Sequence, residues 1–176
     1  ARPCHPAPKR GAQTGRRSFK DDDDPAPSPQ PMPRRRCRYD PPPLLNDLID
    51  RFLASGPYAV VGASRDRAKF GNRVLRCYME QNEVVHPVHP AGGTIENLDA
   101  AESLLTLPEH VAHVSVVTPP AVTEAVVEEA GRAGVEILWM QPGAESEAAV
   151  ARAEALGMGV IHGGPCLLID LPRLRR

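Results

Sequence analysis

The sequence predicts an α/β fold, a doubly wound parallel sheet of five to six strands with helices on both faces, giving three layers. Short apolar runs alternate with amphipathic stretches of helical period from residue 43 onward. Each apolar run is nearly uniformly hydrophobic, as expected of parallel strands that are buried on both faces. A length of 176 residues leaves room for one such domain. Because aromatic residues make up only 4% of the chain, we expect an aliphatic core.

The first half of the domain is expected to hold two helices and two strands. The stretch 42–55 predicts an amphipathic helix that starts at Pro43. Its apolar face consists of Leu44, Leu45, Leu48, Ile49 and Phe52. A short buried strand follows at 58–63. The next helix, at 71–82, has its own apolar face: Val74, Leu75, Tyr78 and Met79. The second strand covers 83–89.

The second half repeats the alternation. A third strand is expected at 113–120 and a fourth at 135–143, with a helix between them that ends at Gly134. This helix, at 121–134, has four residues directed inward: Val122, Ala125, Val126 and Ala130. A helix at 146–157 and a fifth strand at 158–163 follow. After the fifth strand, residues 166–171 are expected to form one more short element, the sixth if it is counted after the five strands.

The first 42 residues differ from the rest in composition. Eleven of the twenty prolines lie within 1–43, together with the runs DDDD and RRRCR. Such a stretch buries too little apolar surface to offset the entropy of ordering, so we expect a disordered tail at 1–42 and one domain at 43–176. An arginine-rich N-terminus is also typical of mitochondrial or plastid transit peptides, which are poor in acidic residues. The acidic run Asp21–Asp24 therefore favours a plain tail and a cytoplasmic location.

Charge and cysteine usage exclude several classes of protein. Residues 41–176 carry eleven Lys and Arg against seventeen Asp and Glu, which argues against nucleic-acid binding. The four cysteines form no CxxC pair, so neither a zinc site nor a disulfide framework is expected. His86, His89, His110 and His113 are not expected to bind a metal either. No apolar run approaches the roughly 20 residues that span a bilayer, so no membrane partner is expected.

The turn after the first strand is the most informative stretch. Gly62 permits a tight turn, and the small residues Ala63 and Ser64 let a ligand approach the main chain. Five of the eleven basic residues of 41–176 lie between Arg65 and Arg76. Parallel sheets bind ligands at the carboxyl ends of their strands, where the N-terminus of the next helix favours an anion. The cluster therefore predicts a polyphosphate ligand; solvated loop charges are the alternative.

The ligand is not expected to be NAD. The G-x-G-x-x-G spacing is absent, since nothing matches it between Gly62 and Gly71. His89 also stands at the end of the second strand, where an acidic residue would bind the ribose. A nucleotide with an additional ribose phosphate, NADP or coenzyme A, fits the basic turn better.

Several of these segments occur together in one known family. VVGASRDRAKFGNRV, VHPVHP, VSVVTPP and ILWMQPG, with a cysteine near the C-terminus, resemble the small coenzyme A-binding proteins of the Rossmann type. These are similar to the nucleotide-binding domain of the succinyl-CoA ligase alpha chain. The resemblance runs from about Leu48 to Asp170 and implies a Rossmann-like domain with coenzyme A as its ligand.

The resemblance also implies the contacts. Gly62, Ala63 and Ser64 would contact the pyrophosphate, with Arg65 and Lys69 neutralising phosphate charge. Phe70 and Gly71 would complete this group where the next helix begins. His89 and Pro90 would border the adenosine, although the family has Asn in place of His89. Further along the chain, two tripeptides would flank the nucleotide and the pantetheine arm respectively: Thr118, Pro119 and Pro120, and Gln141, Pro142 and Gly143.

No nucleophile–base–acid set emerges from the sequence, so we expect a binding module rather than an enzyme. His162 is interpreted as a loop residue at the mouth of the fifth strand. Cys166 is most simply a buried thiol, with a mixed disulfide to the cofactor as the alternative. The expected function is therefore coenzyme A or acyl-CoA binding by a monomer or homodimer whose partner is this small molecule. The alternative is an NADP-binding, oxidoreductase-like protein.

Overall fold

The main sheet has five parallel strands. The computed structural model describes residues 43–54 and 56–174, so the tail expected at 1–42 lies outside the described residues. The strand order is β2-β1-β5-β6-β7, every pair being parallel. The strands are β1 (Tyr58–Val61), β2 (Val85–Val88), β5 (His113–Val116), β6 (Ile137–Met140) and β7 (Gly159–Ile161). The prediction of a doubly wound parallel sheet is confirmed.

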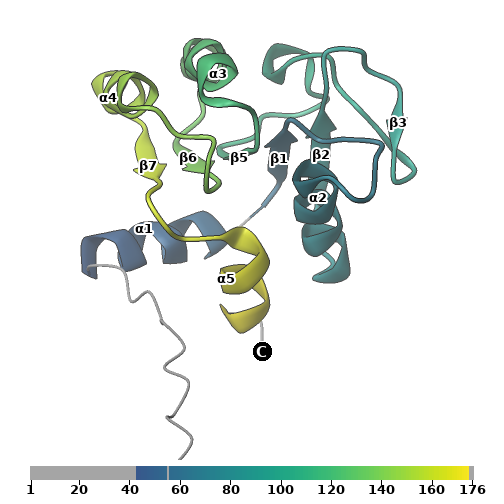
Figure 1. Cartoon of the computed structure of the whole chain (residues 1–176), viewed down its shortest axis with the longest axis horizontal. Coiled ribbons are helices and arrows are strands. Elements are labelled where there is room, and N and C mark those ends of the chain that lie inside the picture. The colour runs from purple at the N-terminus through teal and green to yellow at the C-terminus, as the bar shows by residue number, and fades with distance from the viewer. Residues whose placement is uncertain (1–42, 55, 175–176) are drawn as a thin grey trace, which may run out of the picture. The chain divides into compact units, whose positions relative to one another are not determined.

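Helices cover both faces of this sheet, as the three-layer prediction requires (Figure 1). One face carries α1 (Pro43–Ala54), α2 (Phe70–Glu80) and α5 (Leu167–Leu174). The other carries α3 (Pro120–Ala133) and α4 (Glu147–Ala155). Each layer of helices buries its own cluster of apolar side chains against the sheet.

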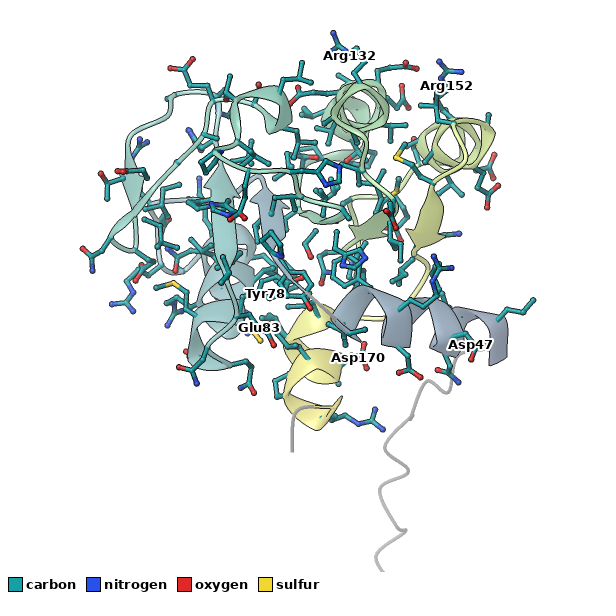
Figure 2. The ribbon with its side chains drawn as sticks, turned by 180° about the vertical axis from the view of Figure 1, so that it is seen from behind. Asp47, Tyr78, Glu83, Arg132, Arg152 and Asp170 are labelled. Carbon is teal, nitrogen blue, oxygen red and sulfur yellow. The ribbon has the colours of Figure 1, made fainter. Side chains whose placement is uncertain are left out.

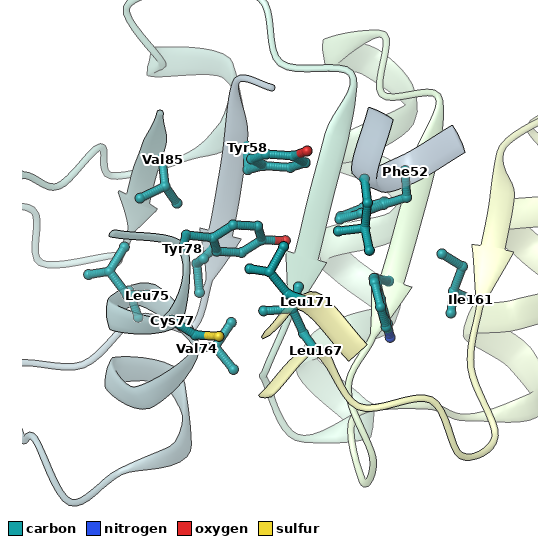
Figure 3. Close-up of a cluster of buried hydrophobic side chains, with 14 of the residues drawn as sticks. Phe52, Tyr58, Val74, Leu75, Cys77, Tyr78, Val85, Ile161, Leu167 and Leu171 are labelled. Carbon is teal, nitrogen blue, oxygen red and sulfur yellow. The ribbon is translucent and has the colours of Figure 1, made fainter. Parts of the chain in front are cut away.

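The two clusters differ in composition. The cluster under α3 and α4 is aliphatic, as expected from the low aromatic content. The cluster under α1, α2 and α5 is not, because it gathers most of the aromatic rings of the described residues. Tyr58 and Tyr78 stack with ring centroids 4.7 Å apart, and Phe52 packs edge-on against Trp139 at 5.2 Å. Figure 3 shows the rings of Phe52, Tyr58 and Tyr78 together with Leu167 and Leu171 of α5.

The predicted buried face of α2 is confirmed, whereas the buried faces of α1 and α3 differ slightly from those predicted. In α3 the buried residues are Thr123, Val126, Val127 and Ala130, whereas Val122 is 48% exposed and Ala125 is exposed. The Thr123 hydroxyl lies 3.3 Å from the carbonyl oxygens of Thr118 and Pro119 and turns this residue inward. Val122, one position earlier, consequently faces outward. In α1, Leu44 is exposed while Ile49 and Phe52 enter the core.

Two regions had no definite sequence-based assignment. Residues 166–171, expected as a short element of unstated type, lie mostly in helix α5, and the sheet has five strands, within the predicted five to six. Residues 90–108 also hold three short elements that were not predicted. A hairpin of β3 (Thr94–Ile95) and β4 (Leu98–Asp99) is followed by a 3-10 turn, η1 (Leu104–Thr106).

Candidate functional site

The order of the strands places a switch point between β1 and β5. The chain leaves β1 through α2 toward β2 on one side, and it leaves β5 through α3 toward β6 on the other. The two helices lie on opposite faces of the sheet (Figure 1). Sheets of this kind leave a crevice at the carboxyl ends of the strands where the order reverses, and ligands bind there.

A cavity of about 340 Å³ lies at this point. Its lining comes from the start of α2 and the segments that follow β5 and β6: Phe70, Val117, Thr118, Pro119, Pro120, Gln141, Pro142, Gly143 and Ala144. Seven of these residues were predicted as contacts; Val117 and Ala144 were not. The structure thus brings three distant segments of the predicted site into one crevice.

The first turn adjoins this crevice through two glycines. Gly62 has a φ of 87°, and a Cβ there would lie 3.0 Å from Cγ2 of Thr118, a crevice residue. A Cβ on Gly71 would lie only 2.1 Å from the Gly62 carbonyl oxygen. Glycine at position 71 therefore lets the N-terminus of α2 approach the end of β1. Ala63 is buried beside them, and the Ser64 hydroxyl accepts the Asp66 N–H at 3.1 Å.

A buried asparagine holds the first turn in place. Asn72 is fully buried, and its Nδ2 donates to the Ser64 carbonyl oxygen at 2.8 Å and to Oε1 of Glu96 at 3.0 Å. Its Oδ1 accepts from Nε of Arg76 at 2.9 Å. Glu96 in turn lies 3.3 Å from Nε of Arg67. This network ties the turn, the start of α2 and the β3–β4 hairpin together.

The hairpin itself comes from a two-residue turn. Glu96 and Asn97 both have positive φ angles, 49° and 66°, which is the conformation of the tight turns that match the twist of paired strands. The Arg65 guanidinium donates to the carbonyl oxygen of Gly92, just before the hairpin. Sequence reasoning did not identify Asn72 or Glu96 as site residues. The local signal for the hairpin turn is Asn97, because asparagine favours the positive φ of such turns.

The five basic residues of the first turn and α2 therefore fall into two groups. Arg65, Arg67 and Arg76 are bonded to Gly92, Glu96 and Asn72. Lys69 is exposed, and the Arg73 guanidinium carbon lies 5.9 Å from the centroid of the Phe70 ring. Basic residues elsewhere behave differently. Figure 2 shows Arg132 and Arg152 on the outer side of α3 and α4, where Arg152 pairs with Glu128.

Gln141 is the one residue of the described crevice lining with an unsatisfied buried side-chain atom. It is 1% exposed, and its Oε1 accepts the Leu167 N–H at 3.0 Å. Its Nε2 has no hydrogen-bond partner in the described part of the chain. Since a buried donor without a partner costs free energy, a ligand acceptor at this position would relieve that cost.

Two cysteines flank the α2–α5 contact. Cys166 is half-buried, and burial raises the pKa of its thiol. Cys77 is buried in the aromatic cluster, where burial raises the pKa of its thiol to about 11. Both thiols are therefore largely protonated at neutral pH. Low reactivity fits the interpretation of Cys166 as a structural thiol.

Two further predicted residues, His89 and Pro90, do not line the crevice. They follow the end of β2, and the His89 ring accepts the Ala91 N–H at 3.1 Å. The His86 ring forms a hydrogen bond with Glu109 at 2.8 Å. Within residues 43–54 and 56–174, no group of three or more potential ligands is placed to hold a metal ion. Over the same residues, no helix is both long and apolar enough to cross a membrane.

A larger cavity, of about 770 Å³, lies elsewhere, along β2 at the edge of the sheet. Its lining includes Val85, His86 and Pro87 of that strand, but none of the predicted contact residues. It lies away from the switch point and the helix N-termini that favour an anionic ligand. The smaller crevice is consequently the better candidate site.

Proteins of known structure share this fold. A conserved hypothetical protein from Pyrococcus furiosus superposes with a TM-score of 0.61 and 38% identity, over 64% of this chain and 97% of that one. A dinucleotide-forming acetyl-coenzyme A synthetase from Ca. Korarchaeum cryptofilum, solved with phosphate and ADP, gives a TM-score of 0.58 at 26% identity. That match covers 66% of this chain and 27% of the synthetase.

The chain is also similar in sequence to a curated protein whose name includes CoA. The ADP-forming acetate–CoA ligase I of Archaeoglobus fulgidus is 33% identical over 88 residues, which is 50% of this chain. The chain spans only 13% of the length of that ligase. The sequence model of the CoA binding domain family matches residues 57–172, which include every strand of the sheet and the whole crevice. The chain therefore belongs to the CoA binding domain family.

Proposed function

We propose that this chain binds coenzyme A, free or acylated, in the crevice between the ends of β1, β5 and β6. The observation that carries the proposal is the meeting of seven predicted contact residues in one cavity; among them is Gln141, whose buried Nε2 is unsatisfied in the described residues. Membership of the CoA binding domain family supports the same ligand.

The crevice and the first turn suit different parts of this ligand. The N–H groups at the start of α2, beside Gly62 and Ser64, favour the diphosphate. His89 and Pro90, at the end of β2, would border the adenosine. The pantetheine arm, which contains two amides, would follow the cavity past Thr118 to Gln141. There one of its carbonyl oxygens would accept the unpaired Nε2 hydrogen.

The proposed role is binding rather than catalysis. The related ligase and synthetase are much longer proteins, of which this chain spans 13% and 27%. The activities that their names describe need not reside in the shared part. A binding module of this size would hold or sense the cofactor while other proteins act on it.

Isothermal titration of the full chain tests the proposal, with coenzyme A, acetyl-CoA and NADPH as separate ligands. We expect both forms of coenzyme A to bind with one-to-one stoichiometry, and NADPH to bind more weakly. No heat of binding with either form at millimolar concentration would reject the proposal. Tighter binding of NADPH would favour the NADP alternative. Native mass spectrometry of the purified chain gives an independent readout of any retained ligand.

A further inference from the structure

The outer edge of β2 is only partly covered. This strand lies at the end of the sheet, beside β1 (Figure 1). The carbonyl oxygens of Val84 and Val88 accept N–H groups from the β1 side, at 2.9 and 3.2 Å. Because the hydrogen bonds of a parallel strand point to alternate sides, Val85 and Pro87 direct their backbone groups outward. There the Pro87 carbonyl oxygen accepts the Ala101 N–H at 3.0 Å, so the second half of the edge is covered.

The first half of the same edge is open. Pro87 has no N–H with which the pairing could continue toward Val85. Residues 98–99 instead form β4, which pairs with β3. Among the residues that the structure describes, the outward N–H and carbonyl oxygen of Val85 therefore have no partner. Unpaired groups at a sheet edge are a template for pairing with another strand.

The cavity of about 770 Å³, here named the β2 groove, lies at this open half. It is bounded by residues 84–87, 98–101 and 106–108 and by the end of α2. Of its apolar side chains, Met79 and Leu98 pack against the cluster on the α2 face of the sheet, and Leu107 packs against the cluster on the α3 face. Successive side chains of a strand point to opposite faces, so an added strand would meet apolar side chains on both of its faces.

The charged side chains of the β2 groove have one sign. Glu83 and Asp99 contribute carboxylates, whereas the described lining includes no Lys or Arg. Asp99 is exposed and has no cation within ion-pair distance among the residues described. A polypeptide segment that carries Lys or Arg would therefore be complementary. A second copy of the same edge would not be, because a symmetric contact brings each patch against itself and so carboxylates against carboxylates.

We propose that the β2 groove binds an extended segment of a partner protein that carries alternating apolar side chains and a Lys or Arg. The segment adds to the sheet through the N–H and carbonyl oxygen of Val85, and its cation lies beside Asp99. The β2 groove and the crevice share no lining residue, so this site does not rest on the proposed function. Together the two sites would hold a bound cofactor and a second protein on one domain.

Selection from a phage library of random heptapeptides, with the full chain as bait, supplies the ligands for the test. We expect the enriched peptides to combine apolar residues with at least one Lys or Arg. In amide proton–nitrogen spectra they should shift the signals of Val85 and Asp99, with or without saturating coenzyme A. Methylation of one peptide backbone nitrogen should weaken binding about tenfold, because it removes the N–H that bonds the Val85 carbonyl oxygen.

Asp99→Lys and Glu102→Lys form a matched pair of variants. Both residues are exposed and undergo the same change of charge, but only Asp99 lines the β2 groove. We expect Asp99→Lys to weaken the selected peptides about tenfold, and Glu102→Lys to weaken them less than about threefold. Coenzyme A affinity and the thermal midpoint should agree between the two variants.

Three results would overturn the proposal. The first is that the unaltered chain enriches no peptides beyond those enriched by Asp99→Lys. The second is that the peptides shift only signals of the crevice, such as those of Thr118 and Gly143. The third is that the Val85 signal shifts with protein concentration in the absence of peptide, which would mean that a second copy occupies the β2 groove. Peptide binding by a chain that does not bind coenzyme A would instead reject the proposed function alone.

Discussion

Gly71 lies directly against the carbonyl oxygen of Gly62, so that a Cβ at position 71 would come within 2.1 Å of it. This oxygen is backbone at the end of a buried central strand and cannot move aside as a side chain can. Gly71→Ala should therefore separate α2 from β1 and lower the free energy of unfolding by at least about 1–3 kcal/mol. Urea unfolding monitored by circular dichroism measures this change.

Gly131→Ala is the matched control for this prediction. A Cβ on Gly131 would lie 3.0 Å from Cδ1 of Leu156, the end of a flexible side chain that is 38% exposed. Alanine also favours a helix over glycine by up to about 1 kcal/mol, so the stability of this variant should change little. Equal stability losses in the two variants would contradict the special closeness of Gly71 to Gly62.

Asn72→Ala should weaken both the fold and the ligand site. The substitution leaves the Ser64 carbonyl, Glu96 and Arg76 without their shared partner at a fully buried position. Unsatisfied buried groups cost about 1–3 kcal/mol, so we expect a stability loss in that range and weaker coenzyme A binding. Asn97→Gly is the control, since glycine readily adopts the φ of 66° at that turn. Undiminished affinity in Asn72→Ala would argue against the network as a brace for the turn.

Gln141→Met should separate ligand binding from stability. Methionine has a similar volume but removes the unpaired Nε2, which is a gain, and the acceptor for the Leu167 N–H, which is a loss. We expect the two effects to leave stability within about 1 kcal/mol, while coenzyme A affinity falls roughly threefold to tenfold. Titration and thermal unfolding of this variant and of Gln81→Met, at the far end of α2, measure the difference. Full affinity in Gln141→Met would show that Nε2 does not contact the ligand.

The sheet and the crevice could be predicted because their signals are local in the sequence. Uniformly apolar runs mark buried parallel strands, and the loops after such strands meet at one edge. Thr118–Pro120 and Gln141–Gly143 therefore came together as expected. The structure of residues 166–171 was harder to predict, because the periodicity of so short an apolar run does not distinguish a helix from a strand. Asp170 accepts the Cys166 N–H at 2.9 Å and so stabilises the start of helix α5.

The division of the basic cluster could not be predicted in this way. Charge counting placed Arg65, Lys69 and Arg73 in one group, because all of them lie in one stretch of the chain. The partner of Arg65, Gly92, is 27 residues away and lies between β2 and the β3–β4 hairpin. That hairpin has two residues in each strand, too few to show the alternation by which strands are recognised.

Alkaline pH should destabilise the fold through Cys77. Burial raises the pKa of this thiol from an ordinary value of 9.0 to about 11 in the folded chain. The unfolded chain therefore releases a proton near pH 9 that the folded chain retains. The contribution of Cys77 to stability is complete below pH 9 and is lost as the pH rises from 9 to about 11.

Cys77→Ala isolates this contribution. Burial also raises the pKa of Tyr78 well above 10, so the unaltered chain should lose stability progressively with increasing pH. Between pH 9 and 11 the variant should lose less per pH unit, by up to about 1.4 kcal/mol, the limit for one proton. Urea titrations at several pH values from 7 to 11 give both slopes. A parallel decline in the two proteins would mean that the Cys77 thiol ionises alike in the folded and unfolded chains, and that its burial in the aromatic cluster does not raise its pKa.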